Sequence, residues 1–323
     1  MRNEKLFKEK FFLESGESLP KLKLVYHTYG ALSEAKDNVI WVFHALTANS
    51  EVLDWWKDLF TEGGALNPDE HFIICANVIG SPYGSTAPVD LDFPDFTVRD
   101  VVKSQLLLAD ELNIRQIKVA IGASFGGSQA LEFAFSFSGT IDRLFLIACG
   151  AKESPWGIAI HQAQRLALEA DQSFGKHGEG RAGLKAARAV GLLTYRCAGA
   201  FEKTQSETDD RIKDFKAASY ISYQGEKLVR RFDSLSYYYL HKCLDTHNIG
   251  RDRGGMLHAL GKISAPTVVI GIDTDQLVPV EMQKFLSDNI PKASYAEITS
   301  EFGHDGFLIE TDQLKMIINK HLN

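Results

Sequence analysis

The stretch KVAIGASFGG, residues 118–127, decides the fold that we expect for this chain. Residues 118–121 form a short run that predicts a buried strand. Directly after the glycines an apolar repeat at helical spacing begins, formed by Ala130, Phe133, Ala134 and Phe137. Between strand and helix lies Gly-x-Ser-x-Gly, the pattern of a sharp turn that exposes a serine hydroxyl at a helix N-terminus. Ser124 is therefore the candidate nucleophile.

Strand-like and helix-like segments alternate on both sides of this turn. We expect strands at residues 21–29, 39–43, 72–78, 118–121, 144–149, 267–272 and 294–298, a capped helix from Thr97 to Leu112 and a closing helix at 306–322. This alternation is typical of an α/β fold, in which a mostly parallel sheet is covered by helices on both faces.

Residues 152–262 differ from the rest of the chain. They are rich in Ala, Leu, Lys, Arg, Gln and Glu, which favour helices, and they contain no convincing strand. Their place between two expected strands predicts a helical insertion. We therefore expect a core formed by residues 1–151 and 263–323, with a helical lid insertion at 152–262.

The composition excludes several classes of protein. With 323 residues, 45% of them hydrophobic and 24% charged, the chain is an ordinary globular one. No apolar run is long enough to span a membrane, and a net charge of −7 argues against a nucleic-acid partner. The four cysteines are scattered without a CxxC pair, which suits a reducing cytoplasm. The histidines other than His304 lack metal-ligand spacing, so we expect no metal.

A serine hydroxyl needs a general base, and that base needs an orienting acid. After a turn of this kind the acid comes next along the chain and the histidine last. His304, in the loop after the last expected strand, is the candidate base. Asp273 and Asp275 both follow the strand at 267–272, and their positions alone leave the choice between them open.

Transfer chemistry at a serine also needs backbone N–H groups that hold a developing oxyanion. Phe125 begins the helix after Ser124, so its N–H is one candidate. The second should come from the loop after an early strand, which here is His44–Thr47.

Charge is unevenly distributed along the sequence. Residues 152–262 carry a net charge of +5, whereas the rest of the chain carries −12. One interpretation is a solvated helical face, and the other is that the lid receives an anionic substrate. For the second interpretation we expect Arg251 and Arg253 at the mouth of the site.

Several motifs together resemble the homoserine O-acetyltransferase family of acyltransferases with the α/β-hydrolase fold. They are Tyr26–Gly30, His44–Thr47, Trp55-Trp56, Asn77–Gly80, Gly84–Thr86, the Ser124 turn, Thr194–Arg196, Arg231–Asp233, Gly250–Gly254, Asp273–Asp275 and Gly303–Asp305. The resemblance runs from about Leu24 to Leu308 and implies an α/β-hydrolase core with a helical lid.

The resemblance also implies roles for single residues. It selects Asp275 over Asp273 as the acid, and it implies that Arg196 and Asp305 hold the carboxylate and ammonium groups of an amino acid. An arginine can grip a carboxylate with two parallel hydrogen bonds, which suits that role.

The chain departs from the family pattern near the expected acyl site. Ser81-Pro82-Tyr83 stand where the family usually has a Gly-Cys pair, Ala87 stands where it has glycine, and Phe125 where it more often has methionine. These departures leave the acyl group open.

The activity that the resemblance implies is a ping-pong acetyl transfer in methionine biosynthesis. Acetyl-CoA, as co-substrate, would acetylate Ser124 and L-homoserine would take up the acetyl group, with the N–H groups of Leu46 and Phe125 holding the oxyanion. The resemblance implies no permanently bound cofactor. It does imply a homodimer built through the lid helices.

Three alternatives stay open at this point. The first is a succinyl donor in place of acetyl, or serine in place of homoserine as acceptor, because residue types do not separate these substrates. The same triad also serves a serine esterase or thioesterase. A non-catalytic binding module is the third alternative.

Overall fold

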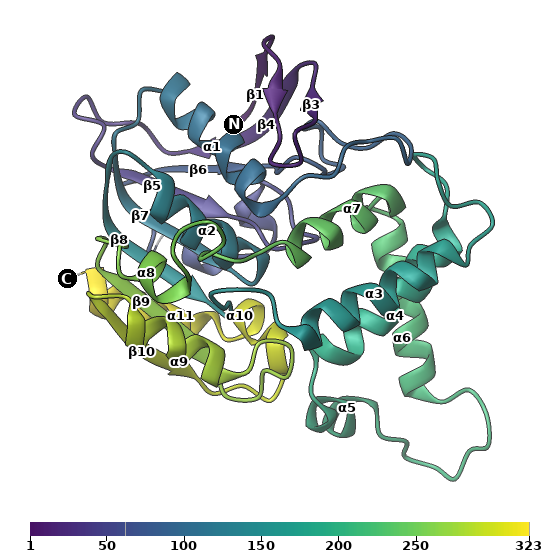
Figure 1. Cartoon of the computed structure of the whole chain (residues 1–323). Helices are drawn as coiled ribbons and strands as arrows, with labels where there is room; N and C mark the ends of the chain where they lie inside the picture. The colour runs from purple at the N-terminus through teal and green to yellow at the C-terminus, as the bar shows by residue number, and fades with distance from the viewer. Residues whose placement is uncertain (62, 323) are drawn as a thin grey trace.

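The computed structural model, which describes residues 1–61 and 63–322, contains a central sheet of eight strands (Figure 1). The strand order is β1-β4-β6-β5-β7-β8-β9-β10. β1 and β4 are antiparallel to their neighbours, and every pairing from β6 to β10 is parallel. The mostly parallel sheet that the sequence predicts is confirmed. The strands are β1 Arg2–Phe7, β4 Leu22–Tyr29, β5 Val39–Phe43, β6 Phe72–Ala76, β7 Gln116–Ala123, β8 Thr140–Ile147, β9 Thr267–Ile272 and β10 Ala293–Ile298.

The observed elements differ from the expected ones mainly at their ends. β1 lies outside the expected strands because it is an edge strand without a buried residue, so no apolar run marks it. A short hairpin, β2 (Phe11–Phe12) and β3 (Ser18–Leu19), follows it. The expected closing helix is divided at Glu310 into α10 (Gly306–Ile309) and α11 (Thr311–Leu322).

Two hydrophobic clusters cover the two faces of the sheet. On one face lie α1 (Val98–Glu111), α2 (Phe125–Ser136), α8 (Met256–Leu260) and α9 (Val280–Asn289). On the other face lie α10, α11 and two short 3-10 helices, η1 (Val52–Asp54) and η2 (Lys57–Leu59). The continuous apolar strands β5, β7 and β9 are therefore buried from both sides, as parallel strands require.

Helix α1 begins with the capping box that the sequence predicts. The Thr97 hydroxyl accepts a hydrogen bond from the N–H of Asp100, and the Asp100 carboxylate accepts one from the N–H of Thr97. Two backbone donors of the first turn are thereby satisfied.

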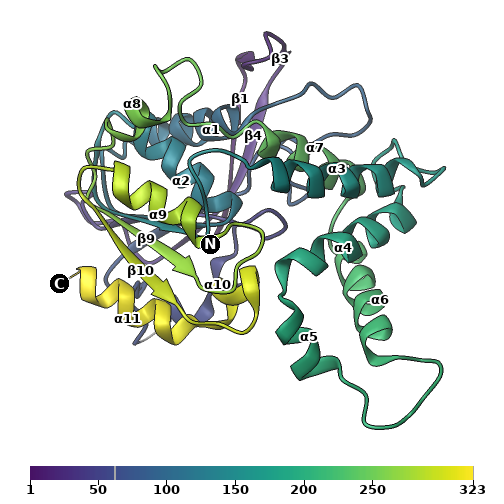
Figure 2. The ribbon, with the colours of Figure 1, turned by 60° about the horizontal axis from the view of Figure 1, so that its bottom comes forward.

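Residues 152–262, all of which the structure describes, contain helices and no strand. The helices are α3 Pro155–Glu169, α4 Arg181–Tyr195, α5 Ala198–Gln205, α6 Lys216–Val229, α7 Ser234–Asp245 and α8. Figures 1 and 2 show α3 to α6 grouped together to one side of the sheet. α8 instead packs against α9. The division into a core and a lid at 151/152 and 262/263 stays a prediction.

Across residues 1–61 and 63–322, the structure has no helix that combines the length and the apolar character needed to cross a bilayer.

Candidate active site

Ser124 lies at the turn between β7 and α2, as the sequence predicts. Its backbone has φ 56° and ψ −125°, a conformation that residues other than glycine rarely adopt. The flanking glycines permit the tight turn: a Cβ on Gly126 would lie 2.1 Å from the Phe43 carbonyl oxygen, and one on Gly122 would lie 2.1 Å from the Gly126 oxygen. The strained turn therefore lifts the Ser124 hydroxyl above the carboxyl end of β7.

A hydrogen-bonded relay joins Ser124 to His304 and Asp275. The Ser124 hydroxyl donates to Nε2 of His304 at 2.7 Å, and the Nδ1–H of His304 donates to Oδ2 of Asp275 at 2.6 Å. The other oxygen of Asp275 accepts the N–H groups of Leu277 and Val278, both at 2.9 Å. Asp275 follows β9, and His304 lies in η3 (Gly303–Asp305) after β10, so parallel strands bring the three residues to one edge.

Asp273 does not take part in this relay. Its carboxylate accepts the N–H of Ser300 at 3.0 Å and thereby ties the loop after β9 to the loop after β10. Between the two aspartates that the sequence leaves open, the structure places only Asp275 against His304.

The surroundings of His304 favour its charged form. Burial lowers the pKa of His304, but the charge of Asp275 and the hydrogen bond to it raise that pKa by more, so that the pKa lies above its ordinary value. The imidazole can therefore take up a proton from Ser124 and hold it.

Two backbone N–H groups lie beside Ser124. That of Phe125 is the first of α2, and Leu46 lies in the turn closed by the hydrogen bond from the N–H of Ala48 to the Ala45 oxygen, at 3.0 Å. Leu46 and Ser124 both line the same cavity. The structure therefore brings together the two elements from which the sequence predicts an oxyanion hole.

A buried glutamine bridges these two elements. The Gln129 amide donates to the His44 oxygen at 3.1 Å and to the Phe125 oxygen at 3.2 Å, and its own oxygen accepts from Gln105 at 2.9 Å. Gln105 in turn accepts the indole N–H of Trp41 at 3.0 Å. This chain of amides fixes the distance between the two N–H elements, and sequence reasoning missed it.

His44 supports the loop from below as a neutral ring. It is completely buried, and burial lowers its pKa to about 4. Its Nδ1–H donates to the Ala45 oxygen at 2.9 Å, and its Nε2 accepts the N–H of Val78 at 3.2 Å. Both ring nitrogens are used in these contacts, so His44 has a structural role.

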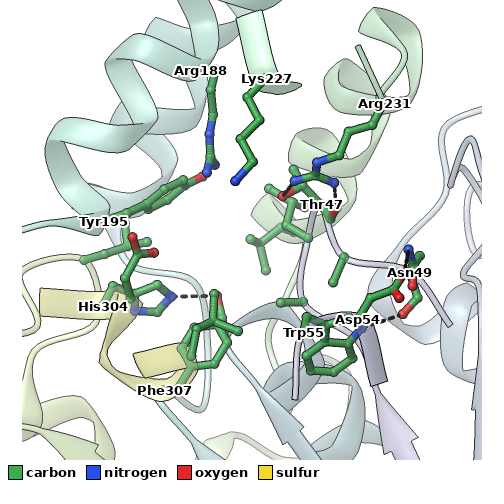
Figure 3. Close-up of a pocket in the computed structure, with 18 of the residues that line it drawn as sticks. Thr47, Asn49, Asp54, Trp55, Arg188, Tyr195, Lys227, Arg231, His304 and Phe307 are labelled. Atoms are coloured by element: carbon green, nitrogen blue, oxygen red, sulfur yellow. Dashed lines mark hydrogen bonds between the residues drawn. The ribbon is translucent and has the colours of Figure 1, made fainter. Parts of the chain in front are cut away.

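A cavity of about 420 Å³ opens above Ser124. Figure 3 shows Arg188 and Lys227 reaching into it from the lid helices, with the Tyr195 hydroxyl beside the Arg188 guanidinium. Residues from the core and the lid line the cavity, among them Leu46, Thr47, Asp54, Trp55, Arg188, Tyr195, Lys227, Arg231, His304, Asp305 and Phe307. The cavity is large enough for a small ligand and is rich in cationic groups.

Arg196 is not among the residues that line this cavity, in the part of the chain that the structure describes. Its Nε donates to Asp305 at 3.2 Å, and its guanidinium lies 5.6 Å from the ring centre of Tyr220 and 5.5 Å from that of Phe302. Arg196 thus contacts Asp305, the other residue implied to hold the amino acid, and its grip on a substrate carboxylate stays a prediction. Arg196 follows the last residue of α4 in an extended conformation, and its partner Asp305 lines the cavity.

Arg188, unlike Arg196, is among the residues that line the cavity. It lies two turns before the end of α4, and Tyr195 is seven residues after it on the same helix face. The guanidinium stacks 5.0 Å from the ring centre of Tyr195. That helical spacing is a signal in the sequence that could have pointed to Arg188. Asp305, by contrast, lines the cavity as expected.

The expectation that Arg251 and Arg253 form the mouth is wrong. Arg251 forms a salt bridge with Glu14 at 2.6 Å, and Arg253 forms a bidentate salt bridge with the buried carboxylate of Glu132. Both are held against the core at other surfaces. The cationic groups at the cavity are Arg188, Lys227 and Arg231, which belong to the lid as the charge count suggests.

Comparisons with known proteins agree with this geometry. A family described as alpha/beta hydrolase fold matches residues 38–311. A protein of Cyclobacterium marinum named homoserine O-acetyltransferase is 43% identical over 322 residues, covering 96% of this chain and 92% of that protein. The chain belongs to the homoserine O-acetyltransferase family. The family that the motifs resemble is thereby confirmed.

Solved structures show how widely the fold of this homoserine O-acetyltransferase family member is shared. The crystal structure of homoserine O-acetyltransferase from Bacillus anthracis matches with a TM-score of 0.92 at 22% identity, over 100% of this chain and 97% of that one. That of esterase E22 matches with a TM-score of 0.89 at 20% identity, over 100% of both chains. At these identities the likeness shows the fold alone.

Proposed function

We propose that this chain transfers an acetyl group from acetyl-CoA to the side-chain hydroxyl of L-homoserine, through an acetyl ester on Ser124. The observation that carries the proposal is the relay Ser124–His304–Asp275 beneath a cavity lined by lid cations. Family membership over nearly the full chain supports the same activity, which would serve methionine biosynthesis.

In the first half-reaction His304 Nε2 takes the proton of Ser124, whose oxygen attacks the thioester carbon. The tetrahedral oxyanion is held by the N–H groups of Leu46 and Phe125. When the intermediate collapses, the carbon–sulfur bond breaks and the thiolate of CoA takes the proton from His304. Asp275 holds the imidazole in the required tautomer and stabilises its charged form.

In the second half-reaction homoserine enters the emptied cavity. His304 takes the proton of its side-chain hydroxyl, and the hydroxyl oxygen attacks the acetyl carbon on Ser124. The same oxyanion forms, and its collapse releases O-acetyl-homoserine while His304 returns the proton to Ser124. No step needs a metal or a permanently bound cofactor, and acetyl-CoA is a co-substrate.

Arg188 and Asp305 supply the two opposite charges that a zwitterionic amino acid requires. Arg188 reaches into the cavity from α4 and can donate hydrogen bonds to the carboxylate of the amino acid. The carboxylate of Asp305, next to His304, can bind its ammonium group. Arg196 then acts through its ion pair, because it orients Asp305 from outside the cavity.

A second, smaller cavity supports acetyl as the acyl group. It measures about 30 Å³, room for one or two water molecules, and Ser124, Phe125, Cys149, Glu153 and Met282 are among its lining residues. A methyl group fits this volume, whereas a succinyl chain would bring its carboxylate against Glu153. Burial raises the pKa of the Glu153 carboxyl, so a second charge beside it is costly.

An esterase is the second candidate function, because the same relay of Ser124, His304 and Asp275 can pass an acyl group to water. The two functions differ in what removes the acetyl group from Ser124. A cavity lined by Arg188 and Asp305, an arginine and an aspartate that match an amino acid, favours transfer over hydrolysis.

The deciding experiment follows the acetyl group. The enzyme is incubated with acetyl-CoA and its intact mass is measured, with Ser124→Ala as the control that should gain no acetyl group. Homoserine, serine or buffer is then added. We expect rapid loss of the acetyl group and formation of O-acetyl-homoserine only with homoserine. Equal CoA release with and without an acceptor would instead identify a hydrolase, and repeating the assay with succinyl-CoA tests the donor.

We further infer a homodimer in the cytoplasm. The lid helices carry exposed apolar side chains, among them Leu166 on α3, Leu193 on α4 and Tyr223 on α6, which a second copy could cover. All four cysteines are free and buried, which suits a reducing compartment. Light scattering of the purified chain measures the oligomeric state directly.

A further inference from the structure

The turn between α6 and α7 contacts the loop that carries Leu46. One terminal nitrogen of Arg231 donates to the Thr47 backbone oxygen and, at 2.9 Å, to the Tyr83 hydroxyl. The other reaches the Thr47 hydroxyl oxygen at 3.4 Å. Figure 3 shows the Arg231 side chain lying over Thr47.

Thr47 is the neighbour of Leu46 in the turn Ala45–Ala48. The hydrogen bond from the Ala48 N–H to the Ala45 oxygen closes this turn, and the Nδ1–H of His44 donates to the same oxygen. The Thr47 oxygen and the Ala48 N–H belong to one peptide unit, and the Ala45 oxygen and the Leu46 N–H belong to another. Arg231 therefore holds the unit that donates to the unit carrying the Leu46 N–H. The orientation of the Leu46 N–H therefore depends on a contact with the lid.

The anchor of Arg231 is rigid although its side chain is exposed. Phe232, the next residue, is buried and packs edge-on against Tyr83 at 5.9 Å and Tyr237 at 6.1 Å. Asp233 caps α7 and also accepts the N–H of Gly178 at 2.8 Å. The backbone that follows Arg231 is thus fixed to both the core and the lid, which places its guanidinium at Thr47.

Tyr83 is the core partner of this contact. It stands in the segment Ser81–Tyr83, where the chain departs from the pattern of its family. Its oxygen accepts from Arg231, and its ring packs against Phe232, so it contacts two consecutive residues of the α6–α7 turn.

We propose that Arg231 is a positioning residue of the oxyanion hole, which couples the lid to the Leu46 N–H through Thr47. The inference rests on the proposed function only in so far as Leu46 holds the oxyanion. The reaction of every acyl donor and of every acceptor proceeds through that oxyanion, so loss of Arg231 slows all of these reactions together. A cation that merely bound an anionic substrate would affect that substrate alone.

The experiment compares Arg231→Gln with Arg230→Gln, a matched change at the preceding arginine, which does not line the cavity among the described residues. For each variant kcat and KM are measured with p-nitrophenyl acetate, an uncharged donor, and with acetyl-CoA plus homoserine. A thermal melt confirms that both variants are folded.

We expect Arg231→Gln to lower kcat by about tenfold with both donors, because a displaced oxyanion donor costs less than a removed one. KM for acetyl-CoA should change less than kcat, and Arg230→Gln should match the wild type. Arg231→Lys, which keeps one donor, should recover part of kcat. A raised KM for acetyl-CoA with unchanged ester hydrolysis would overturn the proposal, and so would an equal loss in Arg230→Gln.

Tyr83→Phe gives a second test that does not depend on the arginine variants. It removes one hydroxyl and keeps the ring that packs against Phe232. We expect a smaller fall in kcat with p-nitrophenyl acetate than Arg231→Gln causes. Combined with Arg231→Gln, Tyr83→Phe should cause no further fall, because both changes remove the same hydrogen bond. Fully additive losses would contradict the coupling. If the wild type hydrolyses the ester but does not acetylate homoserine, the proposed function fails while this comparison still decides the role of Arg231.

Discussion

At the scale of single residues, Asp275 sets both the activity and its dependence on pH. Burial lowers the pKa of His304, but the charge of Asp275 and the hydrogen bond to it together raise that pKa by more. The pKa therefore lies above its ordinary value, and activity is lost as the pH falls through it. Asp275→Asn removes the charge that raises the pKa of His304 and leaves the burial that lowers it. We expect kcat/KM for p-nitrophenyl acetate to fall about 10³–10⁴-fold while its acid limb moves to lower pH.

Asp273→Asn is the matched control for this change. It removes a carboxylate two residues away that accepts the N–H of Ser300 and does not contact His304. Its pH profile should keep the acid limb of the wild type. An equal shift in both variants would show that general loop charge, rather than the Asp275 contact, sets the pKa of His304.

Gln129 is the second residue with a specific expected effect. Gln129→Met keeps the shape but leaves the His44 and Phe125 oxygens and the Gln105 amide without their partner. We expect the free energy of unfolding to fall by about 1–3 kcal/mol, because buried polar groups become unsatisfied. We also expect kcat for p-nitrophenyl acetate to fall, because the two oxyanion elements lose their bridge.

Trp41→Phe separates these two effects of the Gln129 change. It removes the indole donor to Gln105 at the far end of the same chain and leaves the contacts of Gln129 in place. Urea unfolding should show a loss of stability, with kcat close to the wild type. A fall in kcat equal to that of Gln129→Met would mean that destabilisation alone explains both variants.

At the scale of elements, α4 carries the acceptor site. Arg188→Met removes the guanidinium that lies in the cavity, so we expect KM for homoserine to rise about 10–100-fold, the cost of one or two hydrogen bonds to a charged group. Hydrolysis of p-nitrophenyl acetate should be unchanged. Initial rates at varied homoserine measure the effect.

Two further arginines on or beside α4 are the controls for this prediction. Arg181→Met, in the exposed first turn, should leave KM for homoserine unchanged. Arg196→Met should raise it less than Arg188→Met, because Arg196 acts only through Asp305. The opposite order, with a larger rise in KM for Arg196→Met, would identify Arg196 as the residue that binds the substrate carboxylate.

Short-range patterns predict the elements that build the catalytic edge. Ser124 is found from one strand, one turn and one helix, and His304 from its place between the last strand and the last helix. The acceptor site is harder, because it depends on which face of α4 turns to the core. Arg196 stands in a recognisable motif, yet the chain leaves the helix there and its side chain points to Asp305 and two aromatic rings.

At the scale of the whole molecule, long-range ion pairs decide which lid cations are free to meet a substrate. Arg251 and Arg253 look equivalent to Arg188 and Lys227 in the sequence. Their partners Glu14 and Glu132 lie 237 and 121 residues away along the chain, so no local pattern shows that they are already paired. The excess charge of the lid is predictable from the sequence, whereas its location is not.

The remaining cations should attract the anionic donor toward the cavity. Acetyl-CoA carries several negative charges, while the chain outside residues 152–262 has a net charge of −12 and repels it. We expect kcat/KM for acetyl-CoA to fall as ionic strength rises from about 0.01 to 0.15 M, because the screening length shortens from about 30 to about 8 Å. kcat/KM for p-nitrophenyl acetate should stay constant.

Lys227→Met tests whether the cavity, rather than the whole surface, produces this attraction. Lys227 lies one turn before Arg231 and lines the cavity, whereas Lys203 pairs with Glu301 on the exposed outside of the lid. We expect a flatter salt dependence in Lys227→Met and an unchanged one in Lys203→Met. Equal salt dependence of the two donors in the wild type, or an unchanged slope in Lys227→Met, would contradict steering by the lid. A flatter slope in Lys227→Met alone would assign the attraction to a cation that lines the same cavity as Ser124.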